Sequence, residues 1–233
     1  MIIPAFQEQA ALPAALRALR AACAHAAIGS ALTQCDIVVV DDGSTDATAA
    51  VAAQAQVSVL SLPFNLGIGG ALQTGFRFAV RGGYRAAVQF DADGQHDPSF
   101  IHPLVSALDA ADLVIGSRFS ARSAEYQAGK VRRVAMRLLG RIVNRGGLQI
   151  SDPTSGFRAF GPRALELFAQ SYPTEYLDSA EALVLARLRG LTVGEVAVDM
   201  HQRVAGVAST RSWSLLFHYL RLLVVLASQR AQR

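Results

Sequence analysis

The sequence predicts an α/β fold in which a mostly parallel β-sheet is flanked by helices. One observation is the stretch Asp36–Val40 (DIVVV), whose unbroken β-branched run after Asp36 is typical of a strand buried on both faces. A second is that such runs alternate with segments of helical spacing along the N-terminal part of the chain. This alternation requires right-handed crossovers between parallel strands. The loops after the strands are therefore expected at one carboxyl edge of the sheet, where ligands of open parallel sheets bind.

The N-terminal half is expected to contain four strands separated by three helices. The strands are predicted at residues 2–4, 36–40, 57–62 and 86–90. The helices are predicted at residues 12–27, 45–54 and 71–81. We expect Ser44 to cap the second helix, with Asp46 in its first turn. The glycine-rich stretch Phe64–Gly70 is interpreted as a turn that opens the third helix.

The C-terminal half continues the pattern less regularly. Strands are predicted at residues 112–115 and 191–198, and a short one where the turn Ser151–Phe160 ends. Helices are predicted at residues 130–145, 162–168 and 179–189, and a final apolar helix from Ser212. Because we find no repeat or linker, we expect one domain over residues 1–211, followed by that final helix at 212–233.

Composition argues against several classes of function. The formal charge of +4 over 233 residues is mild and spread along the chain, so nucleic-acid binding is not indicated. Cys23 and Cys35 have no metal-ligand spacing, and we expect buried free thiols in a reducing compartment. There is neither a charged leader nor a run of about 18 uncharged apolar residues, so we expect no signal peptide and no membrane-spanning helix.

Two carboxylates with one residue between them follow the strand predicted at 86–90. Side chains alternate along an extended chain, so Asp91 and Asp93 face the same side. Such a pair repels unless a cation lies between its members, and Gln95 can add another oxygen ligand. Mg²⁺ and Mn²⁺ prefer such ligands, although an acidic turn without a metal uses the same residue types. This segment is therefore a candidate metal site.

A second carboxylate pair, Asp41 and Asp42, ends the strand predicted at 36–40. We take the two strands as neighbours, whose ends lie about 5 Å apart, so all four carboxylates are expected in one crevice. A nucleotide fits there, because one pair can accept hydrogen bonds from a ribose or a base while a divalent ion at the other clamps a diphosphate. Gly67 and the glycines after it would allow close approach of the backbone, but a tight helix start explains them about as well.

Seven segments of the chain, in this order, resemble glycosyltransferase family 2. They are IIPAFQE at 2–8, VVVDDGSTDAT at 38–48, NLGIGGAL at 65–72, FDADGQHDP at 90–98, GSR at 116–118, SDPTSGFRAF at 151–160 and R-x-x-G at 203–206. Within the family, the chain is most similar to the GT-A fold enzymes of the dolichol-phosphate mannose synthase type, which transfer sugars to polyprenyl phosphates. Two positions depart from the family pattern: Gln7 stands where Asn is usual, and Ala208 where serine is usual.

The resemblance implies roles for individual residues. The nucleotide pocket would be lined by Pro4, Glu8, Asp41, Asp42 and Gly67, with Asp91 at its metal end. The metal, Mg²⁺ or Mn²⁺, would be held by Asp91, Asp93 and Gln95. Phosphates would be met by Arg118 and Arg203.

The implied reaction is an inverting, in-line displacement at the anomeric carbon, with a nucleoside diphosphate leaving. A polyprenyl phosphate acceptor is already an anion at neutral pH, because its second pKa is about 6, and needs no strong base. A saccharide hydroxyl does need one, for which Asp152 and Asp93 are the candidates. A turn before Pro153 explains Asp152 equally well.

Two further segments are candidates for contact with a lipid acceptor or a membrane. The helix predicted at 130–145 carries Arg132, Arg133 and Arg137, which either receive a lipid phosphate or are solvated surface charges. Trp213–Ala227 is too short to span a bilayer and could contact the membrane surface, a small membrane-protein partner or the core. We therefore expect a cytoplasmic enzyme, peripheral at the inner face of the cell membrane. The alternatives are transfer to a saccharide hydroxyl and a non-catalytic subunit that binds a nucleotide sugar.

Overall fold

The computed structural model describes residues 1–26, 35–118, 140, 143–144, 147–173 and 178–200. The strands are β1 (Ile2–Ala5), β2 (Val38–Asp41), β3 (Ser58–Ser61), β4 (Ala87–Gln89), β5 (Leu113–Ser117), β6 (Arg158–Phe160) and β7 (Val193–Ala197). The helices are α1 (Leu12–Ala26), α2 (Thr48–Gln54), α3 (Gly67–Arg81), α4 (Ile101–Ser106), α6 (Pro162–Gln170) and α7 (Asp178–Leu188), with short 3-10 turns at η1 (Pro98–Phe100) and η2 (Ala107–Asp109). Among these helices none is long and apolar enough to cross a membrane.

The strands form one mixed sheet in the order β3-β2-β1-β4-β6-β5-β7. The strand β6 runs antiparallel to both its neighbours, β4 and β5, whereas the other pairings are parallel. The predicted mostly parallel sheet is therefore confirmed. Because β6 runs the other way, the segment that enters it lies at the same edge as the loops that leave β1, β2, β4 and β5. That edge is the carboxyl edge of the sheet.

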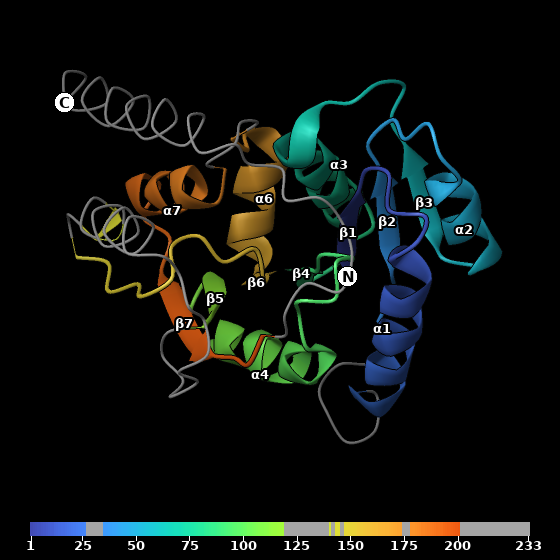
Figure 1. Ribbon diagram of the computed structural model, residues 1–233. Helices are drawn as coiled ribbons and strands as arrows, with labels where there is room; N and C mark the ends of the chain where they lie inside the picture. The colour runs from blue at the N-terminus through green and yellow to red at the C-terminus, as the bar shows by residue number, and fades with distance from the viewer. Residues whose placement is uncertain (27–34, 119–139, 141–142, 145–146, 174–177, 201–233) are drawn as a thin grey trace, which may run out of the picture.

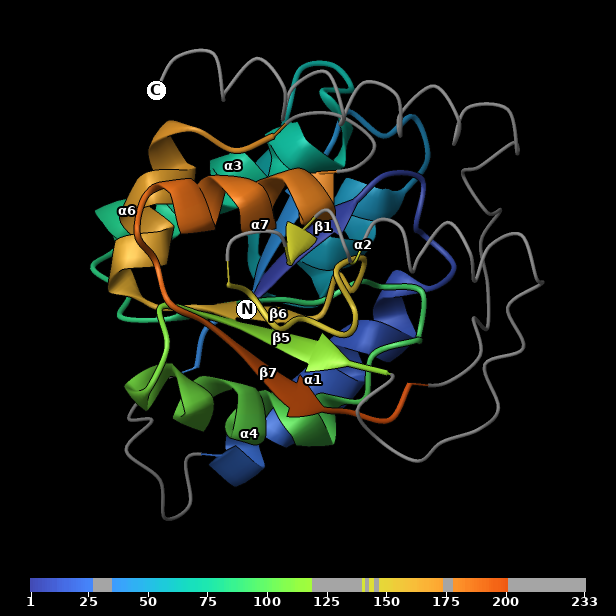
Figure 2. The same cartoon turned by 90° about the vertical axis from the view of Figure 1, so that its left-hand side faces the viewer.

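Helices cover both faces of this sheet (Figures 1 and 2). One apolar layer packs under α3, α6 and α7, and the other under α1 and α4. In β2, Val38 and Val40 belong to the first layer and Val39 to the second. Both sides of this strand are thus buried, which explains its unbroken apolar run.

Two helices begin at different residues from those predicted. The helix α2 begins at Thr48 rather than residue 45, so Ser44 does not cap it. The Oγ of Ser44 instead accepts a hydrogen bond from the backbone N–H of Gln7 at 3.0 Å, and Asp46 accepts one from the N–H of Thr48 at 3.0 Å. The helix α3 begins at Gly67 rather than residue 71, so most of the glycine-rich stretch is helical. Within α3, a Cβ at Gly75 would lie 2.4 Å from a methyl group of Ile2, so glycine allows this helix to pack closely on β1.

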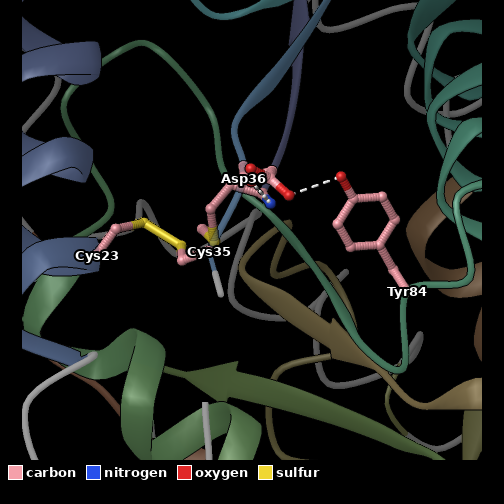
Figure 3. Close-up of a disulfide and its surroundings, with 5 residues drawn as sticks. Cys23, Cys35, Asp36 and Tyr84 are labelled. Atoms are coloured by element: carbon pink, nitrogen blue, oxygen red, sulfur yellow. Dashed lines mark hydrogen bonds between the residues drawn. A yellow bond between two sulfur atoms is a disulfide. The ribbon is translucent and has the colours of Figure 1, made fainter. Parts of the chain in front are cut away.

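A disulfide joins Cys23, in α1, to Cys35, just before β2, and the expectation of free thiols is wrong. The two Cα atoms are 5.6 Å apart, and Figure 3 shows the bond beside the start of β2. The next residue, Asp36, accepts a hydrogen bond from the hydroxyl of Tyr84 at 2.7 Å, which raises the pKa of that phenol. These contacts fasten the edge of the sheet opposite its carboxyl edge.

Several predicted features lie outside the described residues. They are the three arginines Arg132, Arg133 and Arg137, the R-x-x-G segment with Arg203, Ala208, and the final helix from Ser212.

Candidate active site

The carboxyl edge gathers most of the residues predicted for the site. Asp41 and Asp42 end β2, Asp91 and Asp93 follow β4, and Arg118 follows β5. The segment that precedes β6 brings Asp152 to the same edge. The sheet order corrects one expectation, because β1 lies between β2 and β4. The two carboxylate pairs are therefore two strand spacings apart, about 10 Å, with the end of β1 and its Pro4 between them.

The carboxylates at the end of β2 are both buried. Asp41 accepts a hydrogen bond from the N–H of Ser44 at 3.2 Å, and Asp42 accepts one from the N–H of Leu66 at 2.7 Å. Burial raises the pKa of Asp42 and the charge of Asp41 adds to this, while the hydrogen bonds from Leu66 and Gly67 oppose it. Asp42 thus fastens the connection between β3 and α3 to the end of β2.

A glycine allows these two loops to meet. Gly43 has a φ of +70°, and a Cβ there would lie 2.7 Å from the carbonyl carbon of Phe64. Gly67, predicted to contact the nucleotide, lies in the same connection with a φ of +80°, and its N–H bonds to the side-chain oxygen of Asn65 at 3.0 Å. Both glycines are therefore required by backbone geometry at this edge.

The loop after β1 is tied to the loop after β2. Gln7 has a φ of +56°, in the left-handed region where asparagine is favoured among residues with a side chain. This backbone conformation would also suit the asparagine that the family resemblance leads us to expect at this position. The N–H of Glu8 donates to the Oγ1 of Thr48 at 2.9 Å. The sequence motifs did not reveal that Ser44 and Thr48 support this loop.

The carboxylates after β4 differ in exposure. The side chain of Asp91 is 31% exposed, whereas Asp93 is 7% exposed and accepts a hydrogen bond from the N–H of Gln95 at 3.0 Å. The amide of Gln89, in β4, donates to Asp91 at 3.4 Å. A Cβ at Gly156 would lie 3.0 Å from the Oδ2 of Asp91, so the segment before β6 lies close against this carboxylate.

The buried imidazole of His96 supports the same loop. Its Nδ1 accepts a hydrogen bond from the backbone N–H of Asp91 at 3.0 Å, and its ring stacks on Phe157 with the centroids 4.6 Å apart. The pKa of His96 is lowered, mainly because the imidazole is buried. The charges of Asp91 and Asp93 oppose this shift, and the charge of Arg118 adds to it. His96 therefore packs under the acidic motif, and the charge of Arg118 reaches it from the neighbouring half of the site.

Arg118 and Asp152 form a bidentate ion pair. The Nε of Arg118 donates to Oδ2 of Asp152 at 2.6 Å, and its Nη2 donates to Oδ1 at 2.9 Å. The Nη2 also contacts Thr154 at 3.0 Å. Asp152 is 0% exposed, and the side chain of Arg118 is 14% exposed. The carboxylate is thus enclosed, while part of the Arg118 side chain remains exposed.

The residues at this edge can supply oxygen ligands to a metal, but not a complete coordination sphere. Among the described residues there is no group of three or more His, Cys, Asp or Glu side chains that could hold a metal ion. The available donors are the carboxylates of Asp91 and Asp93 and the side-chain oxygen of Gln95. This donor set fits Mg²⁺ or Mn²⁺ when a diphosphate supplies further oxygens.

Comparison with known proteins identifies the family. Residues 1–168 match the model for glycosyl transferase family 2. The chain is 33% identical over 224 residues to polyprenol monophosphomannose synthase from Mycolicibacterium smegmatis, covering 89% of this chain and 79% of that protein. It is 36% identical over 179 residues to undecaprenyl-phosphate mannosyltransferase from Micrococcus luteus, covering 72% of this chain and 69% of that protein. The chain therefore belongs to glycosyl transferase family 2 and is a glycosyltransferase that uses a nucleotide sugar.

A solved structure supports the fold. Glucosyl-3-phosphoglycerate synthase from Mycobacterium tuberculosis, crystallised with Mn²⁺, uridine diphosphate and phosphoglyceric acid, matches with a TM-score of 0.67 at 22% identity. The match covers 98% of this chain and 76% of that one. The expected glycosyltransferase fold is therefore confirmed over the described residues.

Proposed function

We propose that the protein transfers a sugar, with inversion, from a nucleotide sugar to a polyprenyl phosphate. The names of two relatives, a polyprenol and an undecaprenyl-phosphate mannosyltransferase, support this acceptor class. The observation that favours a phosphate over a hydroxyl acceptor is the ion pair of Asp152, whose enclosed carboxylate is bound to Arg118. A hydroxyl acceptor requires a base that can take its proton, whereas a phosphate monoester is already anionic at neutral pH.

The donor half of the site is proposed at the ends of β2, β1 and β4. Asp41, Asp42, Pro4, Glu8 and Gly67 are assigned to the nucleotide. Asp91, Asp93 and Gln95 would hold Mg²⁺ or Mn²⁺, which when bound neutralises charge on the leaving diphosphate. The Mn²⁺ and uridine diphosphate in the similar solved structure support a metal and a nucleotide of this kind.

The acceptor half is proposed at the end of β5. Arg118 would bind the phosphate of the acceptor, and a second arginine, Arg203, is assigned to phosphate from the family motif. A guanidinium suits this task because its planar donors match phosphate oxygens in pairs.

With a lipid acceptor, we propose that the protein acts at the inner face of the cell membrane. We assign residues 1–211 to the transferase domain, and residues 212–233 to a contact with the membrane or with a small membrane-protein partner. Truncation before Trp213 is expected to release the protein from liposomes. Equal sedimentation of the full and truncated forms would contradict this assignment.

The acceptor is tested by mixing the purified protein with Mn²⁺, labelled nucleotide sugars and undecaprenyl phosphate. Label is expected to enter the organic phase with at least one common donor. If label appears only on an added saccharide, the protein acts on a hydroxyl, as the main alternative states. If donors bind but no label moves to either acceptor, both acceptor assignments are wrong.

A further inference from the structure

Polar side chains occupy paired positions of neighbouring strands close to the carboxyl edge of the sheet. Gln89 of β4 pairs with Arg158 of β6, which pairs with Ile115 of β5, which in turn pairs with Glu195 of β7. The three polar members lie at one level of four adjacent strands. Gln89 bonds to Asp91, whereas Arg158 and Glu195 both bond to the segment before β6. None of the family motifs includes Glu195.

Glu195 holds the start of the segment that enters β6. Its carboxylate accepts hydrogen bonds from the N–H of Ser151 at 3.0 Å, the hydroxyl of Ser151 at 2.9 Å and the N–H of Asp152 at 3.1 Å. Charge-assisted hydrogen bonds to a carboxylate are short and strong, so this contact fixes the backbone at Asp152.

Arg158 holds the rest of the same segment. It is 0% exposed, and its guanidinium donates to the carbonyl oxygens of Ser155 at 2.7 Å, Pro153 at 3.1 Å and Ser179 at 2.8 Å. The amides of the segment are thus bound by one strand and its carbonyls by another. The segment Ser151–Ser155 is therefore held by two strands of the sheet in addition to its own turn contacts between Asp152 and Ser155.

The carboxylate of Asp152, held in place by this segment, in turn orients Arg118. It accepts bonds from the Nε and Nη2 of Arg118, from its backbone N–H at 3.3 Å, and from the hydroxyl of Thr154 at 3.1 Å. An enclosed carboxylate with this many donors is suited to orienting a neighbour and poorly placed to take a proton from substrate.

We infer that Glu195 and Asp152 are positioning residues that hold Arg118 in the orientation in which it meets the anionic phosphate of the acceptor. The inference deepens the proposed function and rests on it. A guanidinium that is ordered in advance loses less conformational freedom when it binds. An interaction made equally in the ground state and the transition state changes KM rather than kcat. The loss of either positioning residue should therefore raise the KM for the lipid phosphate.

The kinetic test compares Glu195→Ala, Glu195→Gln and Asp152→Asn, with Glu166→Gln, an exposed glutamate of α6, as the matched control. Glu195→Ala and Asp152→Asn are expected to raise the KM for undecaprenyl phosphate about tenfold or more, as misplacement of a binding group does. The KM for the donor and kcat should stay within about twofold of wild type. The acidic limb of the pH profile should be retained. Glu195→Gln keeps one acceptor oxygen and should recover part of the loss, and Glu166→Gln should match wild type.

Two kinetic results would overturn the inference. One is that Asp152→Asn lowers kcat and removes the acidic limb at an unchanged acceptor KM, which is the behaviour of a general base. The other is that folded Glu195→Ala keeps the wild-type KM. Adding Asp152→Asn to Arg118→Lys should cost little beyond Arg118→Lys alone, because both changes break one ion pair.

A spectroscopic arm tests the same inference without any substrate. The Nε–H proton of Arg118, identified by its absence from the NMR spectrum of Arg118→Lys, should exchange slowly with water in the wild type. In Glu195→Ala the exchange of this proton is expected to be about tenfold faster or more. The midpoint of thermal unfolding should stay near that of Glu195→Gln, so that the faster exchange reports a local change. If the Nε–H of Arg118 exchanges at the wild-type rate in Glu195→Ala, the inference is wrong, whichever acceptor the enzyme uses. Faster exchange in a protein that does not label undecaprenyl phosphate supports the positioning role and refutes only the proposed acceptor.

Discussion

The backbone N–H of Leu66 donates a 2.7 Å hydrogen bond to the carboxylate of Asp42. This bond joins the connection between β3 and α3 to the end of β2, directly beside the region assigned to the nucleotide. The carboxylate that the family resemblance assigns to nucleotide binding therefore also holds the connection between β3 and α3. Loop position and donor binding are expected to change together in this part of the site.

Replacement of Gly43 tests this close approach. Gly43→Ala must place a Cβ 2.7 Å from the backbone of Phe64 at a φ of +70°, so it should both destabilise the fold and weaken donor binding. Gly83→Ala is the matched control, because Gly83 has the same φ but no atom within 4 Å of the added Cβ. The control should lose about 1–2 kcal/mol from left-handed strain alone, and urea unfolding should show a clearly larger loss for Gly43→Ala. Equal losses would remove the steric argument.

Asp93 is expected to be essential for transfer but not for folding. Asp93→Asn removes a negative oxygen ligand while keeping the shape of the side chain, so sugar transfer should fall about a hundredfold or more. The midpoint of thermal unfolding without metal should stay near that of wild type. Mn²⁺ with a donor nucleotide should raise the midpoint of wild type only. Full turnover by this variant would show that Asp93 does not hold the metal.

Asp112 should make stability depend on pH. Partial burial works against its charge, but the hydrogen bonds from Thr192 and the charge of Arg163 hold the pKa of Asp112 below its usual value. A carboxylate whose folded pKa is depressed stabilises the fold above its unfolded pKa, about 3.9, and loses that effect as pH falls through the folded pKa. Asp112→Asn is therefore expected to cost about 1 kcal/mol at pH 7 and progressively less below pH 4.

Urea unfolding across that pH range measures this difference. Asp109→Asn changes an exposed carboxylate in η2, shortly before β5, and serves as the control for the chemical change itself. If the free energy of unfolding differs between Asp112→Asn and wild type by the same amount at pH 7 and at pH 3, the charge of Asp112 does not have this role.

The disulfide should stabilise the fold without serving the site. Cys23 and Cys35 are 12 residues apart in sequence, and closing a loop of this size constrains the unfolded chain by about 3 kcal/mol. The double variant Cys23→Ser with Cys35→Ser should lose about this much stability, and a thiol reductant should lower wild type to the same level. Activity at low temperature should be retained, because the bond lies at the opposite edge of the sheet. A wild type indifferent to reductant would count against the disulfide.

Local patterns predicted the strands and the residues that end them. The run at 36–40 is β2 in all but its first residues, and Asp41 and Asp91 stand at strand ends because an apolar run stops just before each of them. Arg118 follows Gly116 and Ser117, which end β5. The sequence could not indicate that β6 inserts between β4 and β5, because this pairing joins residues far apart in the chain. The separation of the two carboxylate pairs by β1 was missed for the same reason.

The supports of the site were equally invisible in the sequence. Arg158 reads as one polar residue in a three-residue strand, and its burial depends on carbonyl groups of three other residues. Glu195 looks like an ordinary exposed residue of an edge strand until Ser151 and Asp152 are placed beside it. The disulfide was missed because two cysteines at this spacing specify neither a metal site nor a framework.

The bond that the enzyme forms is the most direct test of its proposed activity. The product from undecaprenyl phosphate and the donor identified by labelling can be purified from the organic phase and analysed by phosphorus and proton NMR. We expect the phosphate monoester to become a diester, linked to an anomeric carbon whose configuration is inverted relative to the donor. A product in which the lipid phosphate remains a monoester, or in which the anomeric configuration is retained, would contradict this account.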